Sequence, residues 1–178
     1  VTGGNTLRGS VRISGSKNAA LAAMCAALLT DEDVFLDNVP TISDVDSLGE
    51  LLVSLGAVVE RTGDQSLRIN AADLDRFEAP SSLVTENRAS FQVMGPLLAR
   101  FGFAGSVPPG GDVIGQRPID VHLSGFESMG AEVNRVEELY EVRTTCEGGR
   151  LKGARVFMDY PTVSGSQNVL MAATLAEG

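Results

Sequence analysis

Apolar and polar residues alternate in different ways along the chain, and the changes mark its elements. Residues 7–13 alternate with a period of two, which predicts a strand. Residues 19–29 (AALAAMCAALL) are apolar all the way round, so we expect an Ala-rich helix that is buried on every side. Residues 34–36 then predict a short strand. The chain therefore opens with strand, helix and strand, an order typical of α/β proteins.

A second helix and a hairpin complete this first unit. Ser43 and Asp46 have the spacing of a capping box, with Asp in place of the usual Glu or Gln. The helix that they open has its apolar residues on one face: Val45, Leu48, Leu52 and Leu55. Gly56 ends this helix, and residues 57–61 and 67–70 predict two strands joined by a turn. The full order of the unit is strand, helix, strand, helix, strand, strand.

The same order recurs 74 residues later. The octapeptide that begins at Ser54 matches the one that begins at Ser128 at five of eight places. At this offset Asp46 falls on Asp120, and residues 91–101 provide a second leading helix. The second hairpin is predicted at residues 132–136 and 140–144. A period of this length in an α/β pattern indicates repeated supersecondary units, none of which buries its apolar face alone.

A third copy of the unit begins near the end of the chain. Residues 154–158 predict a strand, and residues 168–176 (NVLMAATLA) predict a third Ala-rich leading helix. We expect the units to run over about 15–72, about 88–145 and about 154–178, with the third one cut short.

Composition restricts the partners of the chain. It has 178 residues, a net charge of −9 and 14 basic residues. This charge argues against nucleic acid and anionic membranes as partners, but a local cluster of cations would still hold a small anion. There is no signal-peptide pattern at the start, and the longest apolar run is too short to span a bilayer. Two cysteines are too few for a disulfide framework, so we expect a cytoplasmic protein with free thiols.

Basic residues stand at the predicted starts of several helices. Lys17 and Asn18 open the first leading helix, Arg88 precedes the second, and Arg117 precedes the helix that follows Asp120. Free N–H groups at a helix start attract anions, and a cation there adds to the attraction. Taken singly, each basic residue is equally compatible with an ordinary surface position. Together they predict a pocket for phosphate or carboxylate groups.

The loop at residues 108–120 (PPGGDVIGQRPID) places an acid between glycines. Asp112 follows Gly110-Gly111, so the backbone around it bends in either direction at little cost. Arg117 precedes Pro118, which we expect at the first position of a helix. A carboxyl group beside an arginine and a helix start suits proton transfer next to an anion. The alternative is an ordinary solvated turn.

Some kinds of chemistry have no support in the sequence. His122 is the only histidine, so zinc sites and Ser-His-Asp triads built on several such residues are not supported. We expect His122 to pack or hydrogen-bond locally. No Gly-x-Gly-x-x-Gly motif follows a strand, so dinucleotide binding is not supported either. We therefore expect neither a metal nor a cofactor.

Five segments carry a resemblance to a known family. They are residues 15–21 (GSKNAAL), 88–90 (RAS), 95–102 (GPLLARFG), 110–120 (GGDVIGQRPID) and 172–178 (AATLAEG). As a set they resemble the UDP-N-acetylglucosamine 1-carboxyvinyltransferases of the enolpyruvyl transferase family. The resemblance implies an inside-out α/β barrel of βαβαββ units, with helices inside and sheets outside. It also implies transfer of the enolpyruvyl group of phosphoenolpyruvate to the 3-hydroxyl of UDP-N-acetylglucosamine with release of phosphate, the first committed step of peptidoglycan synthesis.

The chains of that family are more than twice as long as this one. The resemblance therefore implies that residues 15–178 form most of one lobe and that residues 1–14 contain a strand of the other lobe. The carboxy-terminal lobe would be the missing partner, and it would supply the base that accepts the hydroxyl proton. We expect the chain to be inactive alone.

The resemblance also assigns roles to individual residues. Asp112 would be the proton donor, at a place where most members have the Cys that the antibiotic fosfomycin attacks; members with Asp resist the drug. Lys17 would contact phosphoenolpyruvate, and Tyr160 occupies a place that is often Lys. The substrate-binding positions that it implies are Lys17, Asn18, Arg88, Arg117, Pro118, Ile119, Asp120, Val121, Tyr160, Pro161, Thr162 and Val163.

Two other functions remain open at this point. One is a non-catalytic substrate-binding or interaction fragment. The other is the sibling enolpyruvyl transferase of the shikimate pathway, which shares the repeat but typically has Ser after the lysine that corresponds to Lys17 and lacks the loop at 108–120.

Overall fold

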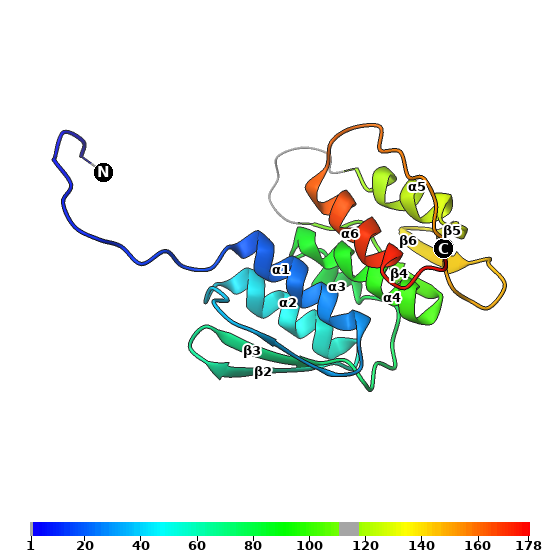
Figure 1. Cartoon of the computed structure of the whole chain (residues 1–178), viewed down its shortest axis with the longest axis horizontal. Helices are drawn as coiled ribbons and strands as arrows, with labels where there is room; N and C mark the ends of the chain where they lie inside the picture. Colours follow the sequence, from blue (N-terminus) through cyan, green and yellow to red (C-terminus); the bar gives the residue numbers. More distant parts are fainter. Residues whose placement is uncertain (1, 111–117) are drawn as a thin grey trace.

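The structure is a computed structural model that describes residues 2–110 and 118–178. Asp112 and Arg117 lie outside the described residues. The amino-terminal segment extends away from the body of the molecule (Figure 1), and residues 7–13 form no strand there. Leu7, for example, is 93% exposed. The strand predicted at 7–13 is therefore absent, because no other strand of the described chain lies beside it to share backbone hydrogen bonds.

Three leading helices form the centre of the molecule. The first is α1 (Lys17–Ala26), which continues as the 3-10 helix η1 (Ala27–Leu29). The second begins as the 3-10 helix η2 (Arg88–Val93) and continues as α4 (Met94–Phe101). The third is α6 (Val163–Ala173), five residues earlier at its start than predicted. Side chains from all three contribute to one apolar core, so the predicted leading helices are confirmed as elements.

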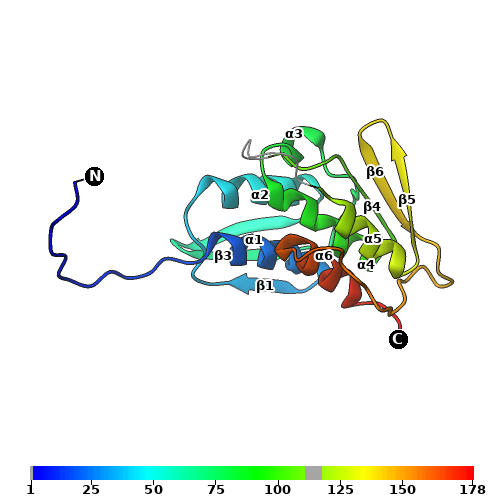
Figure 2. The ribbon, with the colours of Figure 1, turned by 90° about the horizontal axis from the view of Figure 1, so that it is seen from above.

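In the described residues, two three-stranded sheets lie outside these helices (Figures 1 and 2). The first has the order β1-β3-β2, and the second has the order β4-β6-β5, with antiparallel pairing throughout. The strands of the first sheet are β1 (Asp33–Leu36), β2 (Val58–Gly63) and β3 (Ser66–Asn70). Those of the second are β4 (Phe103–Ser106), β5 (Ala131–Val136) and β6 (Leu139–Thr144).

One further helix follows the first strand of each sheet. These helices are α2 (Ser43–Ser54) and α5 (Asp120–Ser128), and a single turn, α3 (Ser81–Val84), lies between the two sheets in sequence. The same elements thus occur twice in the same order, with helices inside and sheets outside. This is the repeated architecture that the sequence predicts, in an incomplete form.

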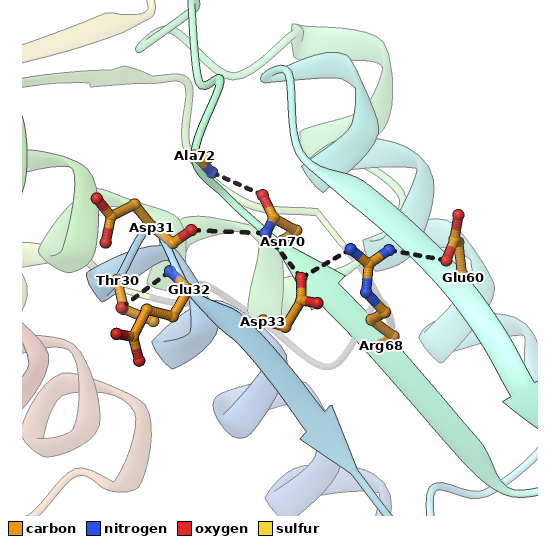
Figure 3. A network of polar contacts seen from close by, with 8 residues as sticks. All are labelled: Thr30, Asp31, Glu32, Asp33, Glu60, Arg68, Asn70 and Ala72. Atoms are coloured by element: carbon orange, nitrogen blue, oxygen red, sulfur yellow. Dashed lines mark hydrogen bonds and ion pairs between the residues drawn. The ribbon is translucent and has the colours of Figure 1, made fainter.

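The register of the first sheet is marked by a cross-strand polar network (Figure 3). Arg68 of the central strand pairs with Asp33 of β1 at 2.8 Å and with Glu60 of β2 at 2.9 Å. Asn70 also donates to Asp33, at 2.7 Å. The hydrogen bonds from Arg68 and Asn70 lower the pKa of the Asp33 carboxyl group. Because these groups face solvent, the network contributes more to strand register than to stability.

Two predicted helix starts are wrong in detail. The carbonyl of Ile119 accepts the first helical bond of α5, from the N–H of Leu123 at 3.1 Å, so Pro118 precedes this helix instead of opening it. The predicted capping box at Ser43 does not form, because α2 begins after Ile42 without a side-chain cap. The carboxylate of Asp46 pairs instead with Arg61 of β2 at 2.7 Å.

The strand predicted at residues 154–158 is also absent. In the described part of the chain, parallel pairing near this place is limited to one bridge between Lys152 and Glu177. A similar single parallel bridge joins Glu78 to Gly105 of β4. Residues 154–158 have no paired neighbour, and the Phe157 side chain is 88% exposed.

The first leading helix is not buried on every side, contrary to the sequence prediction. Ala19 is exposed, and Ala22, Ala23 and Ala26 are half-buried. On α6, Val163 is 72% and Leu170 70% exposed. Apolar surface of this kind recruits a partner or causes association.

We predict that the isolated 178-residue chain associates or is loosely packed, because the apolar faces of α1 and α6 are open to solvent. Sedimentation velocity and amide hydrogen exchange measure both properties. A compact monomer with strong protection throughout α6 would contradict the prediction.

Candidate functional site

A cleft of 670 Å³ lies where the first turns of the three leading helices converge. Lys17 and Asn18 come from α1, Arg88 from η2, and Val163 and Ser164 from α6. The first turn of α2 closes one side of the cleft with Ser43, Asp44 and Ser47. The cleft is therefore built from segments of all three repeat units, far apart in sequence.

A polar side chain caps the start of each leading helix. Ser16 accepts a hydrogen bond from Ala19 at 3.4 Å, Asn87 from Ala89 at 2.9 Å, and Thr162 from Gly165 at 3.2 Å. These caps fix where each helix begins, so the residues that follow point into one shared space. Helix starts that converge in this way favour the binding of anions.

The structure brings most of the predicted site residues together. Those that line the cleft are Lys17, Asn18, Arg88, Pro118, Tyr160, Pro161, Thr162 and Val163. Ile119 and Val121 are instead buried in the core, and Asp120 is exposed at the start of α5. The predicted proton donor Asp112 and Arg117 lie outside the described residues, so the structure does not place them.

Further polar residues line the cleft that sequence reasoning did not assign to the site. They are Ser43, Asp44, Ser47, Glu86, Asn87, Ser164, Gln92 and Gln167. The available signals were weak: Gln92 follows Arg88 by one helical turn, and Asn87 is a typical N-cap residue. Nothing in the sequence pattern pointed to Asp44 as a site residue, because its partner Lys17 lies 27 residues away.

Lys17 is held by an acid from the next helix. Its Nζ lies 3.0 Å from Oδ1 of Asp44, and both side chains are partly exposed. The backbone of Asp44 is also fixed, because its carbonyl accepts a hydrogen bond from Asn87 Nδ2 at 3.1 Å. The ion pair orients the lysine toward the cleft and offsets part of its charge.

A second polar contact joins the segment before α6 to the start of α5. The hydroxyl of Tyr160 donates to Oδ1 of Asp120 at 2.6 Å. The hydrogen bond to this carboxylate raises the pKa of Tyr160. The contact ties the segment before α6 to the start of α5, so a residue that does not line the cleft still positions one that does.

Behind the cleft, Asn168 joins three helices. Its Nδ2 donates to the carbonyl of Phe91 at 3.0 Å and to Nδ1 of His122 at 2.9 Å, and its Oδ1 accepts from the N–H of Gly95 at 2.8 Å. Asn168 is fully buried. Because Nδ2 is a donor, Nδ1 of His122 must accept, so the imidazole is neutral with its proton on Nε2.

His122 packs and hydrogen-bonds, as the sequence predicts, but its partners come from distant segments instead of its own helix. Its ring meets Phe91 edge-on, with ring centroids 5.3 Å apart. The pKa of His122 is lowered to about 4, mainly by burial and also by the positive charge of Arg88, while the negative charge of Asp120 acts in the opposite direction.

Two features are absent from the residues that the structure describes. Across 2–110 and 118–178, no group of three His, Cys, Asp or Glu side chains is placed to hold a metal ion. None of the helices in that part of the chain is both long and apolar enough to cross a membrane.

Comparison with known proteins defines the class of the molecule. A family model described as EPSP synthase (3-phosphoshikimate 1-carboxyvinyltransferase) matches residues 1–178. The chain belongs to this family of enolpyruvyl transferases. A solved structure, the enolpyruvyl transferase NikO from Streptomyces tendae, has the same fold at 22% identity, with a TM-score of 0.76 over 99% of this chain and 40% of that one.

Curated relatives point to one branch of the family. The chain is 48% identical over its whole length to the UDP-N-acetylglucosamine 1-carboxyvinyltransferase of Actinobacillus succinogenes, of which it covers 42%. It is 44% identical to the protein of the same name from Trichormus variabilis, of which it covers 40%. The chain therefore spans about two fifths of the length of these relatives.

We predict that stability falls as the pH decreases from 6.5 toward 4, because unfolding lets His122 bind a proton that the folded chain excludes. The sign follows from the lowered pKa: the unfolded state binds more protons over this range. A pKa shift from 6.5 to about 4 changes the free energy of unfolding by about 3 kcal/mol once the pH has fallen through the whole range.

Chemical denaturation at several pH values, compared with His122→Gln, measures this effect. Glutamine keeps an acceptor for Asn168 but does not titrate, so its loss of stability with falling pH should be smaller. Identical pH profiles for the two proteins would contradict the prediction.

Proposed function

We propose that the chain is one lobe of a UDP-N-acetylglucosamine 1-carboxyvinyltransferase and acts with a carboxy-terminal lobe. The observation that carries the proposal is the convergence of Lys17 and Arg88 with three helix starts on one cleft, in a chain of net charge −9. The identity of 44–48% to enzymes of that name, over the whole chain, supports this choice of substrates.

In the proposed reaction the 3-hydroxyl oxygen of UDP-N-acetylglucosamine adds to C2 of phosphoenolpyruvate while C3 gains a proton. The tetrahedral intermediate then loses a proton from C3 and releases phosphate. The products are the enolpyruvyl ether of the nucleotide sugar and inorganic phosphate. The proton of the 3-hydroxyl goes to a base on the carboxy-terminal lobe.

Residues of the cleft take distinct parts in this proposal. Lys17 and Arg88 bind the phosphate and carboxylate groups of phosphoenolpyruvate, and Asn18 lies between the two substrates. Asp44 keeps Lys17 in place through their ion pair at 3.0 Å. The segment 160–163 binds the nucleotide together with Arg117 and Pro118, and the hydrogen bond of 2.6 Å between Tyr160 and Asp120 holds the two segments side by side.

Asp112 is the proposed proton donor. A carboxyl group has an ordinary pKa of about 3.9, so it must be raised by several units to carry a proton near neutral pH. Enclosure against anionic substrates raises it in the required direction. We also propose a cytoplasmic role in peptidoglycan synthesis; the two free thiols are compatible with that reducing compartment.

The shikimate-pathway activity is the second candidate, favoured by the description of the matching family model. A direct comparison of substrates decides between them. We expect the full-length parent, meaning this chain followed in cis by the carboxy-terminal lobe, to release phosphate from phosphoenolpyruvate with UDP-N-acetylglucosamine but not with shikimate 3-phosphate. The reverse preference, or no release with either acceptor, would refute the proposal.

A variant of the proposed acid tests the mechanism. Asp112→Asn keeps the size of the side chain but removes the proton, so turnover of the full-length parent should fall by about 10²–10⁴-fold. The affinity for UDP-N-acetylglucosamine should persist, because the cleft residues are unchanged. Near-normal turnover would show that Asp112 is only a loop residue.

Antibiotic chemistry gives an independent test of the same position. A carboxylate attacks an epoxide less readily than a thiolate does and forms no thioether. The parent incubated with fosfomycin should therefore gain no mass and lose no activity with time. The variant Asp112→Cys should gain the mass of the drug and lose activity with time. An adduct on the unmutated protein would contradict the assignment.

A further inference from the structure

Two glutamines face each other inside the cleft. Gln92 lies on η2 one turn after Arg88, and Gln167 lies on α6 one turn after Val163. Nε2 of Gln92 donates to Oε1 of Gln167 at 2.9 Å. This bond links the second and third leading helices near their starts.

The other half of the Gln92 carboxamide is unsatisfied. The side chain is only 5% exposed, and within the described residues Oε1 of Gln92 has no hydrogen-bond donor. It is the one buried side-chain nitrogen or oxygen atom in this part of the chain without a partner. A buried acceptor without a donor costs free energy, and its presence in a folded protein requires an explanation.

We propose that Gln92 is a specificity-determining residue whose carboxamide oxygen accepts a hydrogen bond from a hydroxyl or amide N–H of the bound nucleotide sugar. This inference rests on the proposed function of the same cleft. Gln92 lines the same cleft as Lys17, Arg88 and the segment at 160–163, so a ligand that fills the cleft lies within its reach.

The chemistry of the atom limits what it can recognise. A carboxamide oxygen repels the ionised oxygens of phosphate and carboxylate groups and attracts neutral donors. Phosphoenolpyruvate carries no hydroxyl and no N–H when it is fully ionised, whereas a nucleotide sugar carries several. Gln92 therefore discriminates in favour of the nucleotide sugar, and its carboxamide must turn to present the buried oxygen to the ligand.

A site of this kind is predicted to reduce stability in the absence of ligand. An unsatisfied buried acceptor weakens the folded state, while a leucine of similar size would not. Gln167 is already partly exposed, so water can replace Gln92 as the hydrogen-bond donor to its Oε1. Removal of the Gln92 amide should therefore weaken ligand binding without weakening the fold, which is the trade-off common at functional sites.

The test uses Gln92→Leu in the full-length parent. We expect the dissociation constant for UDP-N-acetylglucosamine, measured by calorimetry, to rise about tenfold, as for the loss of one neutral hydrogen bond. The dissociation constant for phosphoenolpyruvate should not change, and the melting temperature without ligand should stay the same or rise. Gln65→Leu, in the turn between β2 and β3, is the matched control and should change neither affinity.

The possible results separate this inference from the proposed function. Unchanged affinity for UDP-N-acetylglucosamine in Gln92→Leu, with or without a lower melting temperature, would show that the glutamine pair is only structural. An equal loss of affinity for both ligands would show that Gln92 does not discriminate. A wild-type parent that fails to bind UDP-N-acetylglucosamine would overturn the proposed function and this inference with it.

Discussion

The hydrogen bonds of Asn168 are the constraint on which the cleft depends. This one buried side chain joins Phe91 and Gly95 of the second leading helix to His122 of α5. A Cβ at Gly95 would overlap the backbone of Asn168, so only glycine allows α4 and α6 to approach this closely. With these helices fixed at their middles, their first turns meet the start of α1 at one place, and a binding cleft results.

A cleft assembled in this way brings Lys17 and Arg88 together with three helix starts in an acidic protein, although Asp44 and Glu86 also line it. Lys17 and Arg88 follow the N-caps of two helices, and Asp44 restrains Lys17. The N–H groups of the first turns add partial positive charge without adding titratable groups. The helix starts therefore favour an anion locally, although the chain as a whole carries a charge of −9.

Local patterns in the sequence predicted the elements, but they did not predict contacts between distant segments. The Ala-rich leading helices and both hairpins were found, because apolar periodicity reports which face is buried. Lys17 and Arg88 were assigned to a common pocket from their equivalent places in the repeat. The partners Asp44 and Gln167 were missed, because tertiary packing alone brings them to Lys17 and Gln92. The strands at 7–13 and 154–158 failed because a strand also requires a neighbour.

The central claim is that the starts of the three leading helices form one substrate site. An amide chemical-shift map of the isotopically labelled full-length parent, titrated with UDP-N-acetylglucosamine, tests it most directly. The account predicts that large shifts appear together at Asn18, Ala89 and Ser164, which belong to three different repeat units. Shifts confined to a single helix start, or located away from all three, would contradict it.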